Sequence, residues 1–103
     1  PVEGATATPL CEAMPHRPHA WPKLWKHHGA AAEAAALTRA VSALPDPSIH
    51  DRYGRVIGLE WLFPKALEVY NADREVFDAM EAWVEAGDWF CWQLTGLGPG
   101  AAR

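Results

Sequence analysis

Prolines divide this chain into short segments and limit the length of any helix or strand in it. The sequence has 9 prolines in 103 residues, and four of them fall between positions 9 and 22. Proline lacks an amide hydrogen and clashes with the preceding helical turn, so we expect no regular structure over Glu12–Pro22. The sequence predicts an ordered loop there and a first helix that begins near Lys23.

The segment before this loop, PVEGATATPLC, alternates small and β-tolerant residues around Gly4 and Pro9. This pattern is typical of an extended ribbon with a turn. A two-stranded ribbon is at best marginally stable alone, because a sheet needs about three strands or a helix packed on it. We therefore expect the ribbon to belong to a larger domain.

Helical spacing dominates the sequence after the loop. Alanine has the highest helix propensity, so the run at 30–36, followed by Leu37, Val41 and Leu44, predicts one helix from about Lys23 to Leu44. Pro45 and Pro47 end it. The next segment, 48–58, is predicted to be a loop with a short strand at 55–57.

Three further helices follow from apolar periodicity and capping residues. One is predicted over Glu60–Tyr70, with Pro64 in its first turn; a second is capped by Asp73, and a last short one is capped by Asp88 and ended by Gly96. The apolar stripe of the second extends through Val84. The predicted fold class is mainly α with a short β ribbon (α+β).

Charge and cysteine usage exclude several classes of function. The net charge is −4 and the sequence pI about 5.7, so neither a nucleic-acid surface nor a membrane surface is expected. Cys11 and Cys91 form no CxxC pair, and we predict that both are buried thiols in a reducing compartment. With no candidate membrane span and no signal peptide, a cytoplasmic protein is expected. The absence of an initiator methionine before Pro1 suggests a processed or partial sequence.

No catalytic or metal-binding motif stands out. His16 and His19 are spaced HxxH and His27 and His28 are adjacent, but no acidic partner is evident, and surface histidines are favoured over ligands. Hydrolase motifs and glycine-rich phosphate loops are absent from the sequence. We predict no bound metal or cofactor.

The 6 tryptophans fall into two groups. Trp83, Trp89 and Trp92 lie among apolar neighbours at helical spacing, which favours core packing. Trp21, Trp25 and Trp61 each adjoin a proline, lysine or glutamate. An indole beside polar donors suits a polyol site, and it equally suits a tryptophan that fixes a loop, so both interpretations stay open.

Three blocks of sequence resemble a known family. PHAWPKLWKHHGAAAEA, GLEWLFPKALEV and EAGDWFCWQLTG, in that order, are similar to the N-terminal domain of FGGY carbohydrate kinases, in particular the ribulokinase branch. The resemblance covers roughly residues 1–96, while the tail at 97–103 diverges and is expected to be frayed. It implies a partial piece of an actin/hexokinase-like (ribonuclease H-like) ATPase domain.

The same resemblance implies a function and a set of binding residues. The implied reaction is phosphorylation of L-ribulose at O5 with ATP and Mg²⁺ in the full-length kinase, whose catalytic aspartate and second ATPase domain would lie outside this chain. The implied substrate-binding residues are Trp25 and Glu60, with Lys26 and Lys65 as weaker candidates. We expect no catalytic residue and no kinase activity in this chain alone. The competing hypothesis is a helical interaction module that self-associates through exposed tryptophans, and a homo-oligomer is compatible with either.

Overall fold

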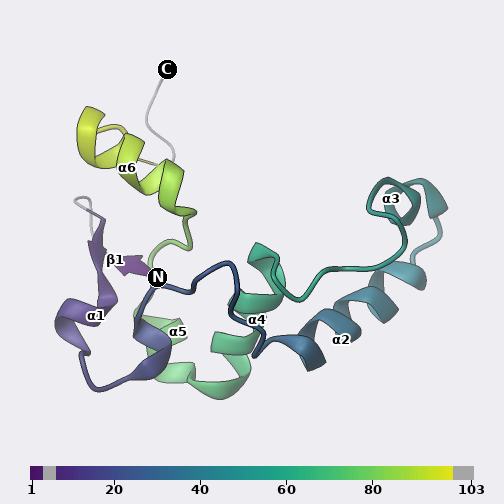
Figure 1. Ribbon diagram of the computed structural model, residues 1–103, viewed down its shortest axis with the longest axis horizontal. Coiled ribbons are helices and arrows are strands. Elements are labelled where there is room, and N and C mark those ends of the chain that lie inside the picture. Colours follow the sequence, from purple (N-terminus) through teal and green to yellow (C-terminus); the bar gives the residue numbers. More distant parts are fainter. Residues whose placement is uncertain (4–6, 99–103) are drawn as a thin grey trace. The chain divides into compact units, whose positions relative to one another are not determined.

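A computed structural model describes residues 1–3 and 7–98 of the chain, which form two compact units. One unit combines residues 1–22 with the segment from residue 72 onward, and the other comprises residues 23–71. The elements, shown in Figure 1, are β1 (Val2–Glu3), β2 (Thr8–Pro9), α1 (Leu10–Ala13), the 3₁₀ helix η1 (Pro18–Ala20), α2 (Ala31–Ser42), α3 (Pro47–Arg52), α4 (Leu62–Ala72), α5 (Arg74–Ala79) and α6 (Ala86–Thr95). The predicted class, mainly α with a small antiparallel ribbon, is confirmed.

The N-terminal ribbon forms as the sequence predicts. β1 and β2 are antiparallel, with Val2 opposite Pro9 and Glu3 opposite Thr8. The predicted turn at Gly4 lies outside the described residues. Val2 also forms an isolated antiparallel bridge with Ala82, and its amide donates to the Ala82 carbonyl at 3.1 Å. The ribbon thus pairs with a segment that lies far along the chain within the same unit.

The loop predicted over Glu12–Pro22 contains more regular structure than expected. Helix α1 continues to Ala13, and η1 covers Pro18–Ala20. Pro18 occupies the first position of η1, where its missing amide hydrogen has no helical partner to lose. Trp21 follows, and its Nε1 donates to the carbonyl of Pro15 at 3.0 Å. A proline-rich stretch can therefore hold one helical turn.

Helix α5 begins at the predicted cap and ends earlier than its apolar stripe suggests. The Asp73 carboxylate accepts a hydrogen bond from the Val76 amide at 3.2 Å, which satisfies one free amide of the first turn. Met80 is already extended, with φ −81° and ψ 123°. The helical continuation to Val84 was therefore a wrong prediction, because the segment after Met80 forms the bridge to β1 instead.

The end of α6 was predicted correctly and its start was not. Gly96 has φ 70°, the left-handed conformation that glycine adopts most readily at a helix C-terminus. Glu85 occupies the N-cap position, so Asp88 lies within the first turn of α6 and is not its cap. Position 88 still favours a carboxylate, because the N-terminal turn carries the positive end of the helix dipole.

The core of this first unit is small. Its fully or almost fully buried apolar residues are Val2, Ala7, Leu10, Ala20 and Val76. Trp89 is half-buried and its Nε1 donates to the Ala7 carbonyl at 2.8 Å. Trp83 and Trp92 are also half-buried, so the expected core tryptophans pack only in part. The prediction of two buried thiols is wrong, since Cys11 is half-buried and Cys91 is exposed.

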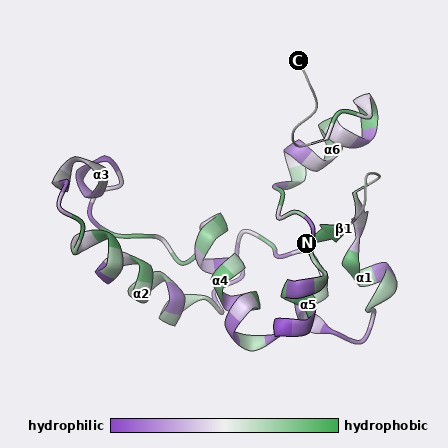
Figure 2. Cartoon of the chain, turned by 180° about the vertical axis from the view of Figure 1, so that it is seen from behind, coloured by the Kyte–Doolittle hydropathy of each residue, from purple (hydrophilic) through white to green (hydrophobic). Residues whose placement is uncertain are grey.

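In the second unit, the alanine-rich helix is shorter than predicted. Helix α2 begins at Ala31, and residues 23–30 form turns with the Trp25–Lys26 pair at the corner of one of them. Figure 2 shows the largely apolar character of α2, interrupted by hydrophilic residues. The prediction of a helix from Lys23 is wrong because the carbonyls of this segment bond elsewhere, as described below.

The segment between α2 and α4 also differs from prediction. Its first half is helix α3, which starts where the Asp46 carboxylate accepts from the Ser48 amide at 2.9 Å. Its second half forms no strand at 55–57. It runs back along α2 in Figure 1, where the Ile57 amide donates to Thr38 Oγ1 at 3.0 Å. A side-chain acceptor thus replaces the strand partner that this segment lacks.

Helix α4 matches the prediction closely, at Leu62–Ala72, with Pro64 in its first turn. Its buried face consists of Pro64, Lys65 and Val69, which pack in a unit whose other buried apolar residues are Ala30 and Ala34. Among the described residues, no helix is both long enough and apolar enough to cross a membrane.

Candidate functional site

The candidate site is the turn segment Lys23–Ala30, which we call the tryptophan turn, together with the helix α4 that supports it. Pro22 precedes the segment and Gly29 lies near its end, and both disfavour a continuous helix through it. One local hydrogen bond, from the His27 amide to the Leu24 carbonyl at 3.0 Å, closes the turn. The carbonyls of Leu24 and Trp25 also accept hydrogen bonds from a side chain of α4.

Lys65 of α4 bonds to this turn. Only 5% of the residue is exposed, and its Nζ donates to the carbonyls of Leu24 at 2.8 Å and Trp25 at 3.2 Å. Nζ also lies 5.6 Å from the centroid of the Trp25 ring, within the range of a cation–π contact. A buried ammonium group needs such partners, because an unpaired buried charge costs several kcal/mol, on the order of a broken buried ion pair.

Glu68, three residues further along α4, makes a second contact with the turn. Its Oε2 and Oε1 lie 2.7 and 3.0 Å from His27 Nε2, and only 13% of its side chain is exposed. Lys23 is half-buried nearby: burial lowers its pKa, and the negative charge of Glu68 opposes that shift. The expectation that the histidines have no acidic partner is therefore wrong for His27.

Gly29 permits this arrangement. A Cβ atom at this position would come within 2.7 Å of His27 Nε2 and would also overlap the Glu68 carboxylate. Real Cβ atoms essentially never approach other atoms so closely. Glycine leaves room here for the imidazole–carboxylate pair, and a larger residue would force the ends of these two side chains to shift.

Glu60 lies in the turn that precedes α4. Its Oε1 is 3.5 Å from Nε2 of His28, so it is linked to the tryptophan turn by a longer contact, and about a third of its side chain (32%) is exposed. The next residue, Trp61, is half-buried and meets Tyr53 edge-on with 5.7 Å between ring centroids. Trp61 therefore stabilises its loop, one of the two roles that the sequence left open.

The two remaining predicted site residues lie on the tryptophan turn and face solvent. Trp25 is 71% exposed, and Lys26 is also exposed. The structure thus brings Lys65 into contact with Trp25, and Lys26 is the next residue of the same turn. Glu60 is joined to the same turn through His28. The exposed indole of Trp25 therefore lies on a turn that Lys65 of α4 supports. The carboxylate of Glu60 contacts this turn, and the exposed ammonium group of Lys26 belongs to it.

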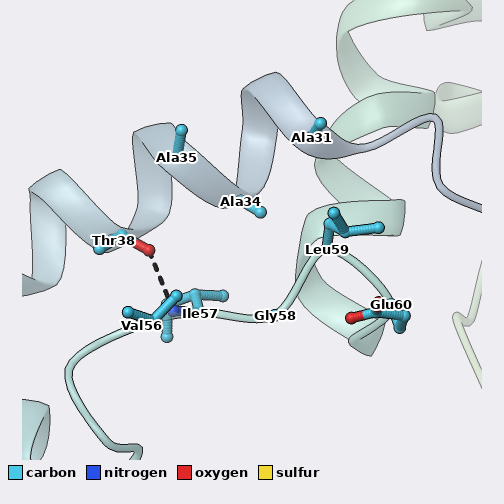
Figure 3. A pocket seen from close by; sticks show the side chains of 9 residues that line it. All are labelled: Ala31, Ala34, Ala35, Thr38, Val56, Ile57, Gly58, Leu59 and Glu60. Carbon is cyan, nitrogen blue, oxygen red and sulfur yellow. Dashed lines mark hydrogen bonds between the residues drawn. The ribbon is translucent and has the colours of Figure 1, made fainter.

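A shallow apolar groove adjoins Glu60. It has a volume of about 470 Å³ and lies between α2 and the segment 56–60. Figure 3 shows the alanines of one α2 face opposite Val56, Ile57 and Leu59, with Glu60 at the end of the row and Thr38 bonded across it. Its lining is mostly hydrocarbon, so the groove favours an apolar surface over a polar ligand.

The described residues offer no group of three or more histidine, cysteine, aspartate or glutamate side chains that could hold a metal ion. The side chains at this surface are an exposed indole, carboxylates and ammonium groups. An indole face packs on C–H groups, while carboxylate and ammonium groups bond to hydroxyls.

Sequence comparisons identify relatives of the chain. It is 43% identical over 86% of its length to a ribulokinase from Mycolicibacterium smegmatis, and 38% identical over 93% of its length to ribulokinases from Anoxybacillus flavithermus and Geobacillus thermodenitrificans. The chain is a homologue of the ribulokinases. It spans about a sixth of the length of these relatives, 16% and 17% of their sequences. No protein-family model matches the chain.

The ribulokinase match includes the whole candidate site. A match over 93% of the chain leaves less than a tenth of it for unaligned ends, so residues 23–71 lie inside the aligned region. The resemblance to the ribulokinase branch that the sequence blocks indicated is thereby confirmed. Which residues of the chain bind substrate is a separate question.

Sequence reasoning missed the contacts that hold the tryptophan turn. His27 and Glu68 were not paired, and Lys65 was named only as a weaker substrate-binding candidate. One signal was present: Lys65 and Val69 are spaced i, i+4, with Glu68 three residues after Lys65, so all three lie on neighbouring positions of one helix face. Two charged residues beside a buried valine on that face need polar partners.

Proposed function

We propose that this chain forms one wall of the acceptor site in an ATP-dependent sugar kinase that phosphorylates L-ribulose to L-ribulose 5-phosphate, a step of L-arabinose catabolism. The proposal rests on one observation, the 71% exposed indole of Trp25 on a turn held by partly buried contacts. Homology to proteins named ribulokinase supports the choice of reaction. A cytoplasmic setting belongs to the proposal, because ATP is available there.

In this proposal the chain binds and orients the pentulose. The face of Trp25 packs on the carbon chain of the sugar, and Glu60 accepts hydrogen bonds from its hydroxyl groups. Lys26 is a further candidate donor to a hydroxyl oxygen. Orientation contributes to phosphoryl transfer because the acceptor oxygen must lie in line with the bond that breaks.

ATP and Mg²⁺ belong to the proposed reaction of the whole kinase. The described residues of this chain do not suit them, since they provide no cluster of carboxylates for the metal, and the sequence has no glycine-rich phosphate loop. We therefore assign this chain no step that passes through the nucleotide or the metal.

The test uses a chimera in which this sequence replaces the matching segment of the Mycolicibacterium smegmatis ribulokinase. Trp25→Ala should weaken L-ribulose binding by about 1–3 kcal/mol, as the loss of an aromatic contact does, and should leave ATP binding unchanged. The matched control is Trp21→Ala, which removes another exposed indole, at 50% exposure. Titration calorimetry measures both affinities. Equal ribulose affinity in the Trp25→Ala and parent chimeras would refute the proposal.

Exposed aromatic residues favour a second candidate function, self-association through a helical module. Besides Trp21 and Trp25, Phe63 at the start of α4 is 73% exposed. Exposed aromatic side chains can mediate protein–protein contacts. Size-exclusion chromatography with light scattering tests this: a stable dimer that dissociates in Trp21→Ala or Phe63→Ala supports the module, and a folded monomer counts against it.

A further inference from the structure

Lys65 is the most unusual charged residue in the described part of the chain. Its side chain comes from the buried face of α4, between Pro64 and the fully buried Val69 region, and the residue is only 5% exposed. Lysine is rarely buried to this extent unless its ammonium group is paired. In the described part of the chain, the ammonium group contacts two main-chain carbonyls and an aromatic ring.

These partners belong to two consecutive residues. The carbonyls of Leu24 and Trp25 accept from Nζ at 2.8 and 3.2 Å, and the ring beside Nζ is that of Trp25 itself. One ammonium group therefore fixes the carbonyl before the Trp25 Cα, the carbonyl after it, and the position of the Trp25 ring. The two residues differ sharply in exposure, at 5% for Lys65 and 71% for Trp25.

The opposite end of the tryptophan turn is fixed separately. His27 bonds to Glu68 of the same helix, and Gly29 leaves room for that pair. A turn that is held at both ends by α4 can hold an exposed indole in one orientation without burying it. Such preorganisation raises affinity because less side-chain and loop freedom is lost when a ligand binds.

We infer that Lys65 is a positioning residue, which fixes the orientation of the Trp25 indole toward the pentulose and does not itself contact the sugar. This inference rests on the proposed function, in which Trp25 packs on the substrate. It assigns Lys65 a role that differs from direct hydroxyl binding, although both roles predict weaker binding when the lysine is lost. A double-mutant cycle separates them.

The cycle compares the parent chimera with Trp25→Ala, Lys65→Met and the double variant, by titration with L-ribulose. Methionine keeps the length and apolar stem of lysine and removes the donors. Lys65→Met should weaken binding about 3- to 10-fold, because an indole that is no longer held in place must lose that freedom when the sugar binds. In the Trp25→Ala background the same change should have little further effect, because residues that act through one another are not additive.

Each outcome of this cycle decides a different statement. If Lys65→Met weakens binding by the same factor with and without Trp25, the lysine contacts the sugar directly and the inference is wrong. Unchanged binding in Lys65→Met, with weaker binding in Trp25→Ala, also refutes it and leaves the proposed function intact. Unchanged binding in Trp25→Ala refutes the proposed function itself.

A second readout follows the indole directly in the 103-residue chain. The Nε1–H signal of Trp25, assigned in ¹⁵N spectra by its loss in Trp25→Phe, should shift and broaden in Lys65→Met. Lys65→Arg, which keeps the charge and can donate to two carbonyls, should restore it at least in part. Arg52→Met, an exposed cation removed from α3, is the control and should leave the signal in place. A Trp25 signal that is identical in Lys65→Met and the parent would overturn the inference. If Lys65→Met fails to fold, the Lys65→Arg variant provides the test, and a Trp25 signal there that does not resemble the parent signal would overturn the inference.

Discussion

Two glycine-to-alanine substitutions should change stability in opposite directions. Gly29 lies against the His27–Glu68 pair, and a Cβ atom there would overlap both side chains. Gly87, inside helix α6, has no heavy atom within 4 Å of the position its Cβ would take. The two replacements are chemically the same, so any difference in sign comes from the surroundings.

The magnitudes follow from what must move. At position 29 the imidazole and the carboxylate must separate, which removes hydrogen bonds of 2.7 and 3.0 Å in a partly buried pair. A hydrogen bond to a charged group contributes about 1.5–3 kcal/mol, and the exposure of His27 places this pair near the low end. Lower chain entropy of alanine offsets about 0.4–1 kcal/mol. Gly29→Ala should therefore destabilise the chain by about 0.5–1.5 kcal/mol.

At position 87 there is nothing to displace, so only the backbone and helix propensity contribute. Gly87→Ala should stabilise the chain by about 0.5–1 kcal/mol. For a domain of this size, 1 kcal/mol corresponds to a shift in Tm of about 4–8 °C.

Thermal unfolding followed by far-UV circular dichroism measures both shifts. Because the chain has two compact units, its thermal unfolding need not be a single transition, so amide hydrogen exchange is measured as well. Gly29→Ala should weaken the protection of amides in α4, and Gly87→Ala should strengthen the protection of amides in α6. An unchanged or higher Tm for Gly29→Ala, with unchanged His27 ring signals in NMR spectra, would refute the reasoning.

Three further predictions concern the other unit and the activity of the chain. Asp73→Ala should destabilise α5 by about 1 kcal/mol, seen as faster amide exchange at Val76, because the carboxylate caps that helix. Hydrogen bonds from Arg17 hold the pKa of Asp73 below its usual 3.8. This carboxylate therefore stabilises the folded state at neutral pH, and its contribution is progressively lost as pH falls below about 4, so the acid limb of the unfolding curve should flatten in Asp73→Asn. The isolated 103-residue chain should release no ADP from ATP and Mg²⁺ in a coupled assay with L-ribulose, and ribulose-dependent turnover abolished by Trp25→Ala would contradict this.

Local signals in the sequence located several helix ends and turns. Asp73 caps α5, Gly96 ends α6, and Pro64 lies in the first turn of α4, as predicted. Each of these depends on the chemistry of one residue within one turn: a carboxylate that accepts an amide, a glycine with positive φ, a proline where no amide is needed. Such rules need no knowledge of the tertiary structure.

The wrong predictions depended on contacts distant in sequence. Residues 55–57 have the composition of a strand, but the Ile57 amide bonds to Thr38 and no neighbouring strand is present in the described part of the chain. The stripe through Val84 has helical spacing, but the chain beyond Met80 bridges to Val2. Propensity describes what a segment prefers alone, and tertiary partners decide between preferences of similar strength.

The candidate site shows the same division. Resemblance to known kinases drew attention to Trp25, Glu60, Lys26 and Lys65, and the exposure of Trp25 agrees with a surface role without testing it. The contacts of Lys65 could not be predicted, because its acceptors are main-chain carbonyls about 40 positions away and carry no signal in the sequence. Had residues 23–30 formed the predicted helix, the carbonyls of Leu24 and Trp25 would have accepted from amides four residues later and would not have been available to Lys65.

The turn and the burial of Lys65 therefore depend on each other. A helix through Trp25 would leave a buried ammonium group without acceptors, and a neutral side chain at position 65 would remove the donor to the Trp25 carbonyl, while the Leu24 carbonyl would keep the His27 amide. Both states are costly, so the lysine favours the turn over the helix that the flanking alanines would otherwise extend. Lys65→Met should consequently raise helix content over residues 23–30, visible as new sequential amide contacts in NMR spectra. An unchanged turn in that variant would show that Pro22 and Gly29 alone determine its shape.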